Sequence, residues 1–296
     1  MRITPNHESQ LRQRGYVLVP GFLTADDLAA ARANFLRYAP TAEELAATPE
    51  RYSAFLEDAQ NLQTEFPFAG EALNHISTHP EIITFVERLL GTPEVLLSQA
   101  AIWAKYAGTG DFEQGLHLDY EGNTLVVPRE DGDFRQVNFI LYYSDVTPEM
   151  GPTFVVSQEQ TRDLPIWPPF RTRKKNPELY KQEKPVLAQA GDLLIFGMRT
   201  LHRASAIAAT SGARFSHHLV YRAASHAFAG YHQWSRFGER PEMKAFLEKA
   251  TPRQREVVGF PPPGHRYWNE QTVSAVGARY QGMDMTPYRS ALQADR

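Results

Sequence analysis

Residues 137–143, VNFILYY, decide the fold class of this chain. Large apolar residues recur at every second position from Val137 to Tyr143, and Asn138, Ile140 and Tyr142 stand between them. Because successive side chains of an extended strand point to opposite faces, this alternation is typical of a β-strand within a packed sheet. The stretch therefore predicts a strand, and the rest of the chain can be compared with it.

Further short strands are expected on both sides of this stretch, at residues 95–106, 153–156, 193–196 and 215–221. Turn residues separate them, including the pair Gly191-Asp192. Because no helical pattern lies between these strands, an antiparallel barrel or jelly roll is favoured over a Rossmann fold. We therefore predict a fold that is mainly β with α additions, and a β-rich core over residues 94–222.

The two flanks of this core differ from it. Residues 1–93 are predicted to form a helical support, since Thr24 fits an N-cap and the segment from Pro80 to Gly91 fits a complete helix. A short strand is expected at residues 16–19, ahead of the first of these helices. Residues 223–296 have mixed character, and we expect this extension either to cover a site or to form a dimer contact. Residues 1–296 are interpreted as one domain.

Composition excludes several classes of function. The chain has 296 residues, 42% of them hydrophobic, and a formal net charge of -3, so nothing indicates a nucleic-acid partner. The absence of cysteine excludes disulfides, cysteine-ligated zinc, iron–sulfur clusters and a thiol nucleophile. No signal peptide or membrane-length apolar run is visible. We expect a cytoplasmic protein without a membrane partner, acting as a monomer or homodimer.

His117-Leu118-Asp119 is the central chemical motif. Residues two apart on a strand share a face, so the imidazole and the carboxylate can bind one metal. The pair alone is weak evidence, because composition yields roughly 0.4 such pairs by chance. The alternative is a surface histidine and aspartate at the end of a strand.

A second histidine, His202, strengthens the motif. It follows the turn Gly191-Asp192, the apolar strand 193–196 and a loop, and in a jelly roll that strand can lie beside the first pair. Two histidines and one carboxylate on one side of a metal leave three positions open, which is the arrangement used for iron(II) and oxygen activation. His202 alone would more simply be a partly buried histidine.

Arg214 and Ser216 begin the last predicted strand and share a face. A buried guanidinium beside a hydroxyl suits a bidentate grip on a carboxylate. The alternative is an exposed arginine at the start of a strand. The adjacent His217 and His218 point to opposite faces, so both cannot face one metal.

Together these pieces resemble the phytanoyl-CoA dioxygenase family of iron(II)/2-oxoglutarate-dependent oxygenases. The resemblance runs from about residue 11 to residue 222. It is carried by the segments RGYVLVPGFL (14–23), QGLHLD (114–119), DVTPEMGPT (145–153) and GDLLIF (191–196), followed by His202 and Arg214. The order and spacing of these segments are more specific than any one of them.

The resemblance implies a double-stranded β-helix core (a jelly roll of the cupin type). It implies that His117, Asp119 and His202 bind Fe(II), and that Arg214 binds the distal carboxylate of the cosubstrate 2-oxoglutarate. Thr153, Gln114 and Ser216 match positions that contact the same cosubstrate. With O2, the implied reaction forms succinate and CO2 and hydroxylates a small-molecule substrate.

Several points bear on specificity. Halogenating relatives carry a small residue where this chain has Asp119, so a carboxylate there argues against halogenation. Residues 156–160 depart from the family pattern, which leaves the substrate open. Tyr120, next to a ligand, and Asn138, a polar residue on an apolar strand, are predicted to contact the substrate.

The alternative functions are those of a hydrolase or isomerase using the same three metal-binding residues, and of a non-catalytic or non-oxidative metal-binding cupin-type protein. A hydrolase or isomerase needs no carboxylate clamp such as Arg214 with Thr153, and a non-catalytic protein would be expected to lose a ligand, whereas none is missing here.

Overall fold

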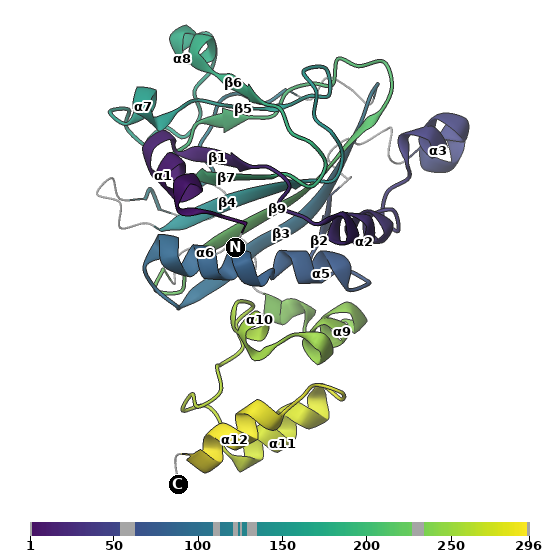
Figure 1. Cartoon of the computed structure of the whole chain (residues 1–296), viewed down its shortest axis with the longest axis vertical. Coiled ribbons are helices and arrows are strands. Elements are labelled where there is room, and N and C mark those ends of the chain that lie inside the picture. Colours follow the sequence, from purple (N-terminus) through teal and green to yellow (C-terminus); the bar gives the residue numbers. More distant parts are fainter. Residues whose placement is uncertain are drawn as a thin grey trace.

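The computed structural model describes residues 2–53, 63–108, 113–120, 124, 126–128, 135–226 and 234–294. Its largest element is a six-stranded antiparallel sheet in the order β1-β7-β4-β9-β3-β2 (Figure 1). The strands are β1 (Tyr16–Val19), β2 (Gln63–Glu65), β3 (Val95–Tyr106), β4 (Gln136–Tyr142), β7 (Leu193–Gly197) and β9 (Ala213–Ala223). The predicted strand at 137–143 is thus confirmed as a central strand, β4.

A smaller antiparallel sheet faces the large one and has the order β6-β5-β8. Its strands are β5 (Thr153–Val155), β6 (Lys184–Val186) and β8 (His202–Arg203). Two bridges extend it beyond β8, because Leu116 pairs with Arg171 and His117 pairs with His202. In Figure 1 this sheet lies above β1, β7 and β4.

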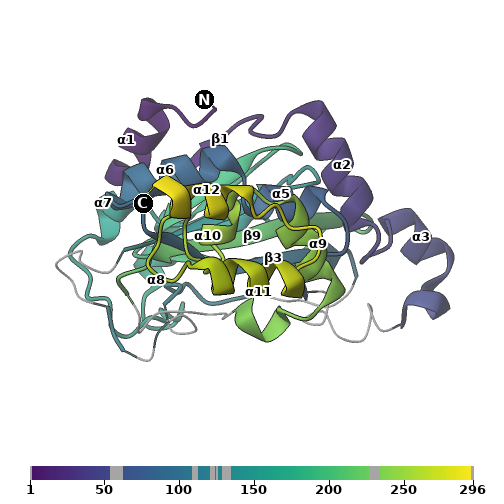
Figure 2. The same ribbon diagram turned by 90° about the horizontal axis from the view of Figure 1, so that it is seen from below.

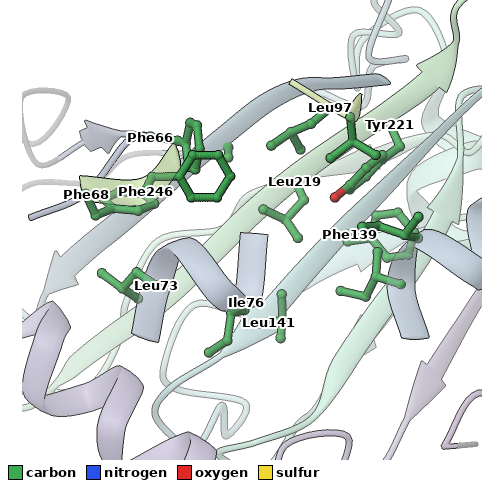
Figure 3. Close-up of a cluster of buried hydrophobic side chains, with 14 of the residues drawn as sticks. Phe66, Phe68, Leu73, Ile76, Leu97, Phe139, Leu141, Leu219, Tyr221 and Phe246 are labelled. Atoms are coloured by element: carbon green, nitrogen blue, oxygen red, sulfur yellow. The ribbon is translucent and has the colours of Figure 1, made fainter. Parts of the chain in front are cut away.

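Alternation along β4 separates the two faces of the large sheet. Phe139 and Leu141 belong to the main hydrophobic core, whereas Ile140 and Tyr142 pack between the sheets in a second cluster with β7 and the small sheet. Figure 3 shows Phe139 and Leu141 on the core side, near side chains from β9 and helix α5. Even-numbered residues of β4 therefore face the space between the two sheets.

Helices cover the outer face of the large sheet. Those preceding β3 are α1 (Pro5–Arg14), α2 (Ala25–Phe35), α3 (Ala42–Ala47), the 3-10 helix η1 (Pro49–Tyr52), α5 (Ala72–Ser77) and α6 (Pro80–Leu90). Their ends follow the sequence signals: Thr24 accepts a hydrogen bond from the Asp27 N–H, and Gly91 ends α6 in the left-handed region at φ 65°. Two short helices, α7 (Gln158–Thr161) and α8 (Pro177–Gln182), lie between the strands of the small sheet in the sequence.

The C-terminal helices lie beyond α5 and α6, on the same side of the large sheet (Figure 1). They are the 3-10 helix η2 (Trp234–Phe237), α9 (Pro241–Lys249), α10 (Pro252–Glu256), α11 (Glu270–Arg279) and α12 (Thr286–Ala294). They lie beneath β3 and β9, on the side of the large sheet away from the small sheet (Figures 1 and 2). Of these helices, α11 and α12 lie farthest from the sheet. Phe246 of α9 packs in the main core with Phe66, at 4.9 Å between ring centroids. A role for this segment as a dimer contact remains a prediction.

The described chain is mixed α/β, with more helix than the predicted mainly β fold. The physical reason is the outer face of the large sheet, whose apolar side chains need helices from both ends of the chain to bury them. In the N-terminal zone the predicted strand at residues 16–19 is confirmed as β1, whereas β2 was not predicted. None of the helices in the described residues is both long and apolar enough to span a membrane.

Candidate metal and cosubstrate site

His117 and His202 are direct partners across an antiparallel bridge. The backbone N–H of His117 donates to the His202 carbonyl at 2.9 Å, and the reverse bond is 3.1 Å long. Side chains of directly opposed residues leave a sheet on the same face. The two imidazole rings accordingly lie 4.4 Å apart between centroids.

Asp119 completes a compact group with these two histidines. Its Oδ1 lies 3.3 Å from Nε2 of His117, and its Oδ2 lies 3.2 Å from Nε2 of His202. One ligand atom from each of the three residues can be chosen so that all lie within 4.8 Å of one another. Ligands about 2.1 Å from one metal and about 90° apart would stand roughly 3 Å from each other. The group therefore fits a single divalent metal bound on one side.

Backbone carbonyls set the tautomer of both histidines. Nδ1 of His117 lies 2.9 Å from the Gly115 carbonyl, and Nδ1 of His202 lies 3.1 Å from the Thr200 carbonyl. A carbonyl can only accept, so in each ring Nδ1 carries a proton, and Nε2 is the nitrogen directed at Asp119. Both Nε2 atoms are thus prepared to bind a metal.

The charge of the site comes from Asp119. Burial alone would raise the pKa of its carboxyl, but interactions with His202 and His117 outweigh that effect and hold the pKa well below its usual range. The carboxylate is therefore ionised at neutral pH. One negative charge with two neutral imidazoles is a donor set suited to iron(II).

Arg214 lies on β9, on the face toward the small sheet, and is 8% exposed. Its Nη1 donates to the Gly151 carbonyl, whereas its Nε has no hydrogen-bond partner among the residues that the structure describes. Gly151 has φ 65°, and an added Cβ would come within 2.8 Å of the Ser205 carbonyl, so this tight turn requires glycine. A buried guanidinium with an unused donor is available to an anionic ligand.

Three further polar residues lie near Arg214. The Tyr142 hydroxyl donates to Oγ1 of Thr153 at 3.5 Å. Burial raises the pKa of Tyr142, and the nearby charge of Arg214 offsets part of that rise. Ser216 is 1% exposed and pairs across strands with Tyr142, with its Oγ 3.1 Å from Nε2 of His218. The structure thus brings Arg214, Thr153 and Ser216 together, and it adds Tyr142 to this group.

The other predicted residues are placed differently. The side-chain oxygen of Gln114 accepts the Ala204 N–H at 3.1 Å, so part of its amide extends the pairing beside β8. The ring of Tyr120 packs in an apolar cluster with Leu118, and its hydroxyl donates to the Ile166 carbonyl. Asn138 is 2% exposed and faces the space between the sheets. Substrate contacts by Tyr120 and Asn138 remain predictions.

Gln136 is a residue of this site that the sequence analysis missed. Its Nε2 donates to the Asp119 carbonyl at 3.0 Å and to Oδ1 of Asn138 at 3.3 Å. The sequence did contain a signal, because Gln136 stands two positions before Asn138 and therefore shares its face of the strand.

The two neighbouring histidines of β9 point to opposite faces. His217 is enclosed in the core by Ser77 and Tyr143, while His218 faces the site beside Trp103.

Comparisons with known proteins agree with this geometry. The sequence profile described as phytanoyl-CoA dioxygenase (PhyH) matches residues 11–215. No curated protein sequence matches the chain. Three solved structures illustrate the likeness of fold. The α-ketoglutarate-dependent epimerase SnoN from nogalamycin biosynthesis is 21% identical with a TM-score of 0.54, over 74% of this chain and 82% of SnoN.

The other two structures are HygX from Streptomyces hygroscopicus with iron bound and EctD from S. alaskensis with 2-oxoglutarate and 5-hydroxyectoine. HygX is 14% identical with a TM-score of 0.55, over 76% of this chain and 88% of HygX. EctD is 18% identical with a TM-score of 0.56, over 76% of this chain and 77% of EctD. At these identities the likeness establishes a shared fold.

Proposed function

The chain belongs to the phytanoyl-CoA dioxygenase family of iron- and 2-oxoglutarate-dependent oxygenases, and we propose that it hydroxylates a small-molecule substrate with release of succinate and CO2. The observation that carries the proposal is the presence of two polar sites between the facing sheets, one on the small sheet and one on β9. His117, Asp119 and His202 form a metal-binding group, and Arg214 offers a buried carboxylate clamp. We also propose that the two facing sheets form the double-stranded β-helix of this family.

Each residue has a definite part in this proposal. The three ligands would hold iron on one side and leave the opposite positions to 2-oxoglutarate and oxygen. When bound, iron supplies oxygen activation, with 2-oxoglutarate as the co-reductant. The guanidinium of Arg214 would hold the distal carboxylate, with Thr153 and Ser216 beside it, and Gln114 is proposed as a further cosubstrate contact. Asp119 fills the position that a halogenase needs for chloride, so hydroxylation is the outcome we propose.

Arg214 also separates this function from the alternatives. A hydrolase, an isomerase or a non-catalytic cupin-type metal protein needs no buried cation beside its metal. In water-free surroundings an unpaired guanidinium is costly, and burial lowers the pKa of Arg214. A protein that keeps such a group gains from an anionic ligand, and this favours the 2-oxoglutarate-dependent function.

The class of substrate is proposed from the neighbours and from the rim of the site. Structures of SnoN and HygX contain nogalamycin RO and hygromycin B, which supports a secondary-metabolite-like substrate here. The ring of Phe170, which is 53% exposed, stacks on the ring of His117 at 5.8 Å between centroids. Exposed aromatic rings beside a metal ligand suit a substrate with an apolar face.

A screen tests the proposal. The iron(II)-loaded protein is incubated with 2-oxoglutarate, oxygen and a library of natural-product-like small molecules, and succinate and product masses are measured. We expect at least one compound to gain one oxygen atom in proportion to succinate. Product formation that does not depend on 2-oxoglutarate would contradict the proposal and favour a non-oxidative metal enzyme.

A further inference from the structure

The strand register divides the inner face of the large sheet into two halves. Along β9 the inward residues run from Arg214 through His218 to Arg222, a span of about 27 Å. His218 lies midway between Arg214 and Arg222 on this face, and its Nε2 lies 3.1 Å from Oγ of Ser216. Arg214 therefore marks a cosubstrate half, and the residues beyond His218 form a second half.

Two amides of β4 line this second half. Asn138 pairs across strands with Val220, and Gln136 pairs with Arg222, so both lie beyond His218 when counted from Arg214. Asn138 is 2% exposed and Gln136 is 6% exposed. These amides are joined to the metal group because Gln136 donates to the carbonyl of Asp119.

Hydrogen bonding fixes the orientation of both amides. The Asp119 carbonyl can only accept, so Gln136 must turn its nitrogen toward it at 3.0 Å. That nitrogen also donates to Asn138, which must therefore present its oxygen at 3.3 Å. The orientation leaves the Asn138 nitrogen as a free donor and the Gln136 oxygen as a free acceptor.

Both of these free atoms are buried and have no hydrogen-bond partner in the part of the chain that the structure describes. A buried polar atom without a partner costs free energy, so such atoms in a native protein call for a ligand or a water molecule. A donor and an acceptor side by side are complementary to a group that itself carries an acceptor and a donor.

We propose that Asn138 and Gln136 form a specificity pair that binds an uncharged acceptor–donor group of the substrate, such as an amide or two neighbouring hydroxyls. The inference rests on the proposed function, because it places the substrate on the side of the metal opposite the cosubstrate clamp. Arg222 borders the pair, with its Nη1 donating to the Ala223 and His226 carbonyls. Its charge disfavours a cationic group at this position.

Three small probes of nearly equal shape test the pair. Acetamide carries an acceptor and a donor, acetone only an acceptor, and acetate two acceptors and a charge. Each is titrated into zinc(II)-loaded protein saturated with 2-oxoglutarate, zinc being a redox-inert substitute for iron. The readout is the chemical shift of the side-chain NH2 signals of Asn138 and Gln136, assigned from their loss in Asn138→Leu and Gln136→Met.

We expect acetamide to bind about 3- to 10-fold more tightly than acetone or acetate, the range that one added neutral hydrogen bond provides. Asn138→Leu should abolish this preference while leaving the dissociation constant of 2-oxoglutarate within about twofold. The matched control Ile140→Val alters the next inward residue of β4 and should keep the preference. If Asn138→Leu does not fold, Asn138→Ser serves in its place. The order of affinity of the three probes for the wild-type protein tests the pair even if neither variant folds.

Equal binding of acetamide and acetone would overturn the specificity pair. Tightest binding of acetate would also overturn it and would identify an anion site at Arg222 instead. The 2-oxoglutarate titration is a separate signal for the proposed function. A zinc-loaded protein that prefers acetamide but does not bind 2-oxoglutarate would support the pair and contradict the proposed function.

Discussion

His117 and His202 lie opposite one another in a single antiparallel bridge, with their Nδ1 atoms directed at backbone carbonyls and their Nε2 atoms at the carboxylate of Asp119. This relationship joins two segments that are far apart in the sequence. It is built from backbone pairing, so the geometry of the metal group is set by the fold before any metal binds. The predictions below follow from this arrangement and from the groups that support it.

Removing one ligand should abolish metal binding without unfolding the protein. His202→Ala is expected to weaken iron(II) binding by at least about 100-fold, because even the loss of a residue that only supports a ligand costs 10- to 100-fold. Affinity is measured by competition with a chelator of known strength. His75→Ala, at an exposed position of α5, is the control and should bind iron as the wild type does. Unchanged affinity in His202→Ala would refute the ligand assignment.

Arg214 should determine the affinity for 2-oxoglutarate but not for iron. Arg214→Lys keeps the charge and loses the two-pronged donor geometry, so we expect a 10- to 100-fold rise in the dissociation constant of 2-oxoglutarate. Isothermal titration of the metal-loaded protein measures it. The control Arg12→Lys, at an exposed position of α1, should leave the dissociation constant of 2-oxoglutarate unchanged. A loss of iron affinity in Arg214→Lys would indicate a structural role instead.

The buried pair Arg203–Glu183 should stabilise the small sheet next to His202. Two hydrogen bonds of 2.7 Å join the two side chains, which are 4% and 8% exposed, and the ring of Phe154 lies under the guanidinium at 4.4 Å. Arg203→Met would leave the buried Glu183 with only the exposed Arg173, at 3.8 Å, as an ion-pair partner among the described residues, and we expect a loss of about 3 kcal/mol in the free energy of unfolding.

Urea unfolding measures the effect of Arg203→Met, and two variants serve as controls. The double variant Arg203→Met/Glu183→Leu removes both charges and should recover most of the loss. Lys181→Met breaks an exposed pair with Glu178 and should cost less than about 1 kcal/mol. Equal losses in the single and double variants would contradict a role for the buried charge.

Stability should fall in mild acid partly because of His217. Burial lowers the pKa of this imidazole from 6.5 to about 3, while Ser77 and Tyr143 hold it neutral in the core. Between pH 6.5 and about 3 the unfolded chain binds a proton that the folded chain does not. The free energy of unfolding should therefore decrease as pH falls, by up to about 1.4 kcal/mol per pH unit for this residue.

His217→Gln should make this pH dependence shallower by about one proton. His79 and His218, whose pKa values burial also lowers, to about 4 and about 3, will leave part of the slope in place. Unfolding of metal-free protein is followed from pH 7 to pH 4, so that metal release does not contribute. His75→Gln, at an exposed site, should retain the wild-type slope, and a wild-type slope in His217→Gln would contradict the assignment.

The parts of the fold that the sequence predicted are those with strong local signals. The alternation at 137–143 located β4 to within one residue, and Pro80 and Gly91 gave both ends of α6, because these patterns depend on near neighbours. The two faces of β9 were also predicted, since His217 and His218 do point apart. These features need no knowledge of distant segments.

The parts that were missed depend on contacts between distant residues. Strand β8 contains only His202 and Arg203, too few for any periodicity, and it forms because β5 and His117 pair with it. Gln136 was missed because its partner is a backbone carbonyl of another segment. In each case tertiary packing decides what sequence proximity cannot.

The most direct test of the central claim is an anaerobic titration of the wild-type protein with iron(II) and then with 2-oxoglutarate, followed by visible absorption. If His117, Asp119 and His202 hold iron with open positions beside the Arg214 clamp, chelation by the keto acid produces a metal-to-ligand charge-transfer band that saturates at one equivalent. The band should be absent in His202→Ala and should need more 2-oxoglutarate in Arg214→Lys. Iron that is demonstrably bound but gives no band with 2-oxoglutarate would contradict the account.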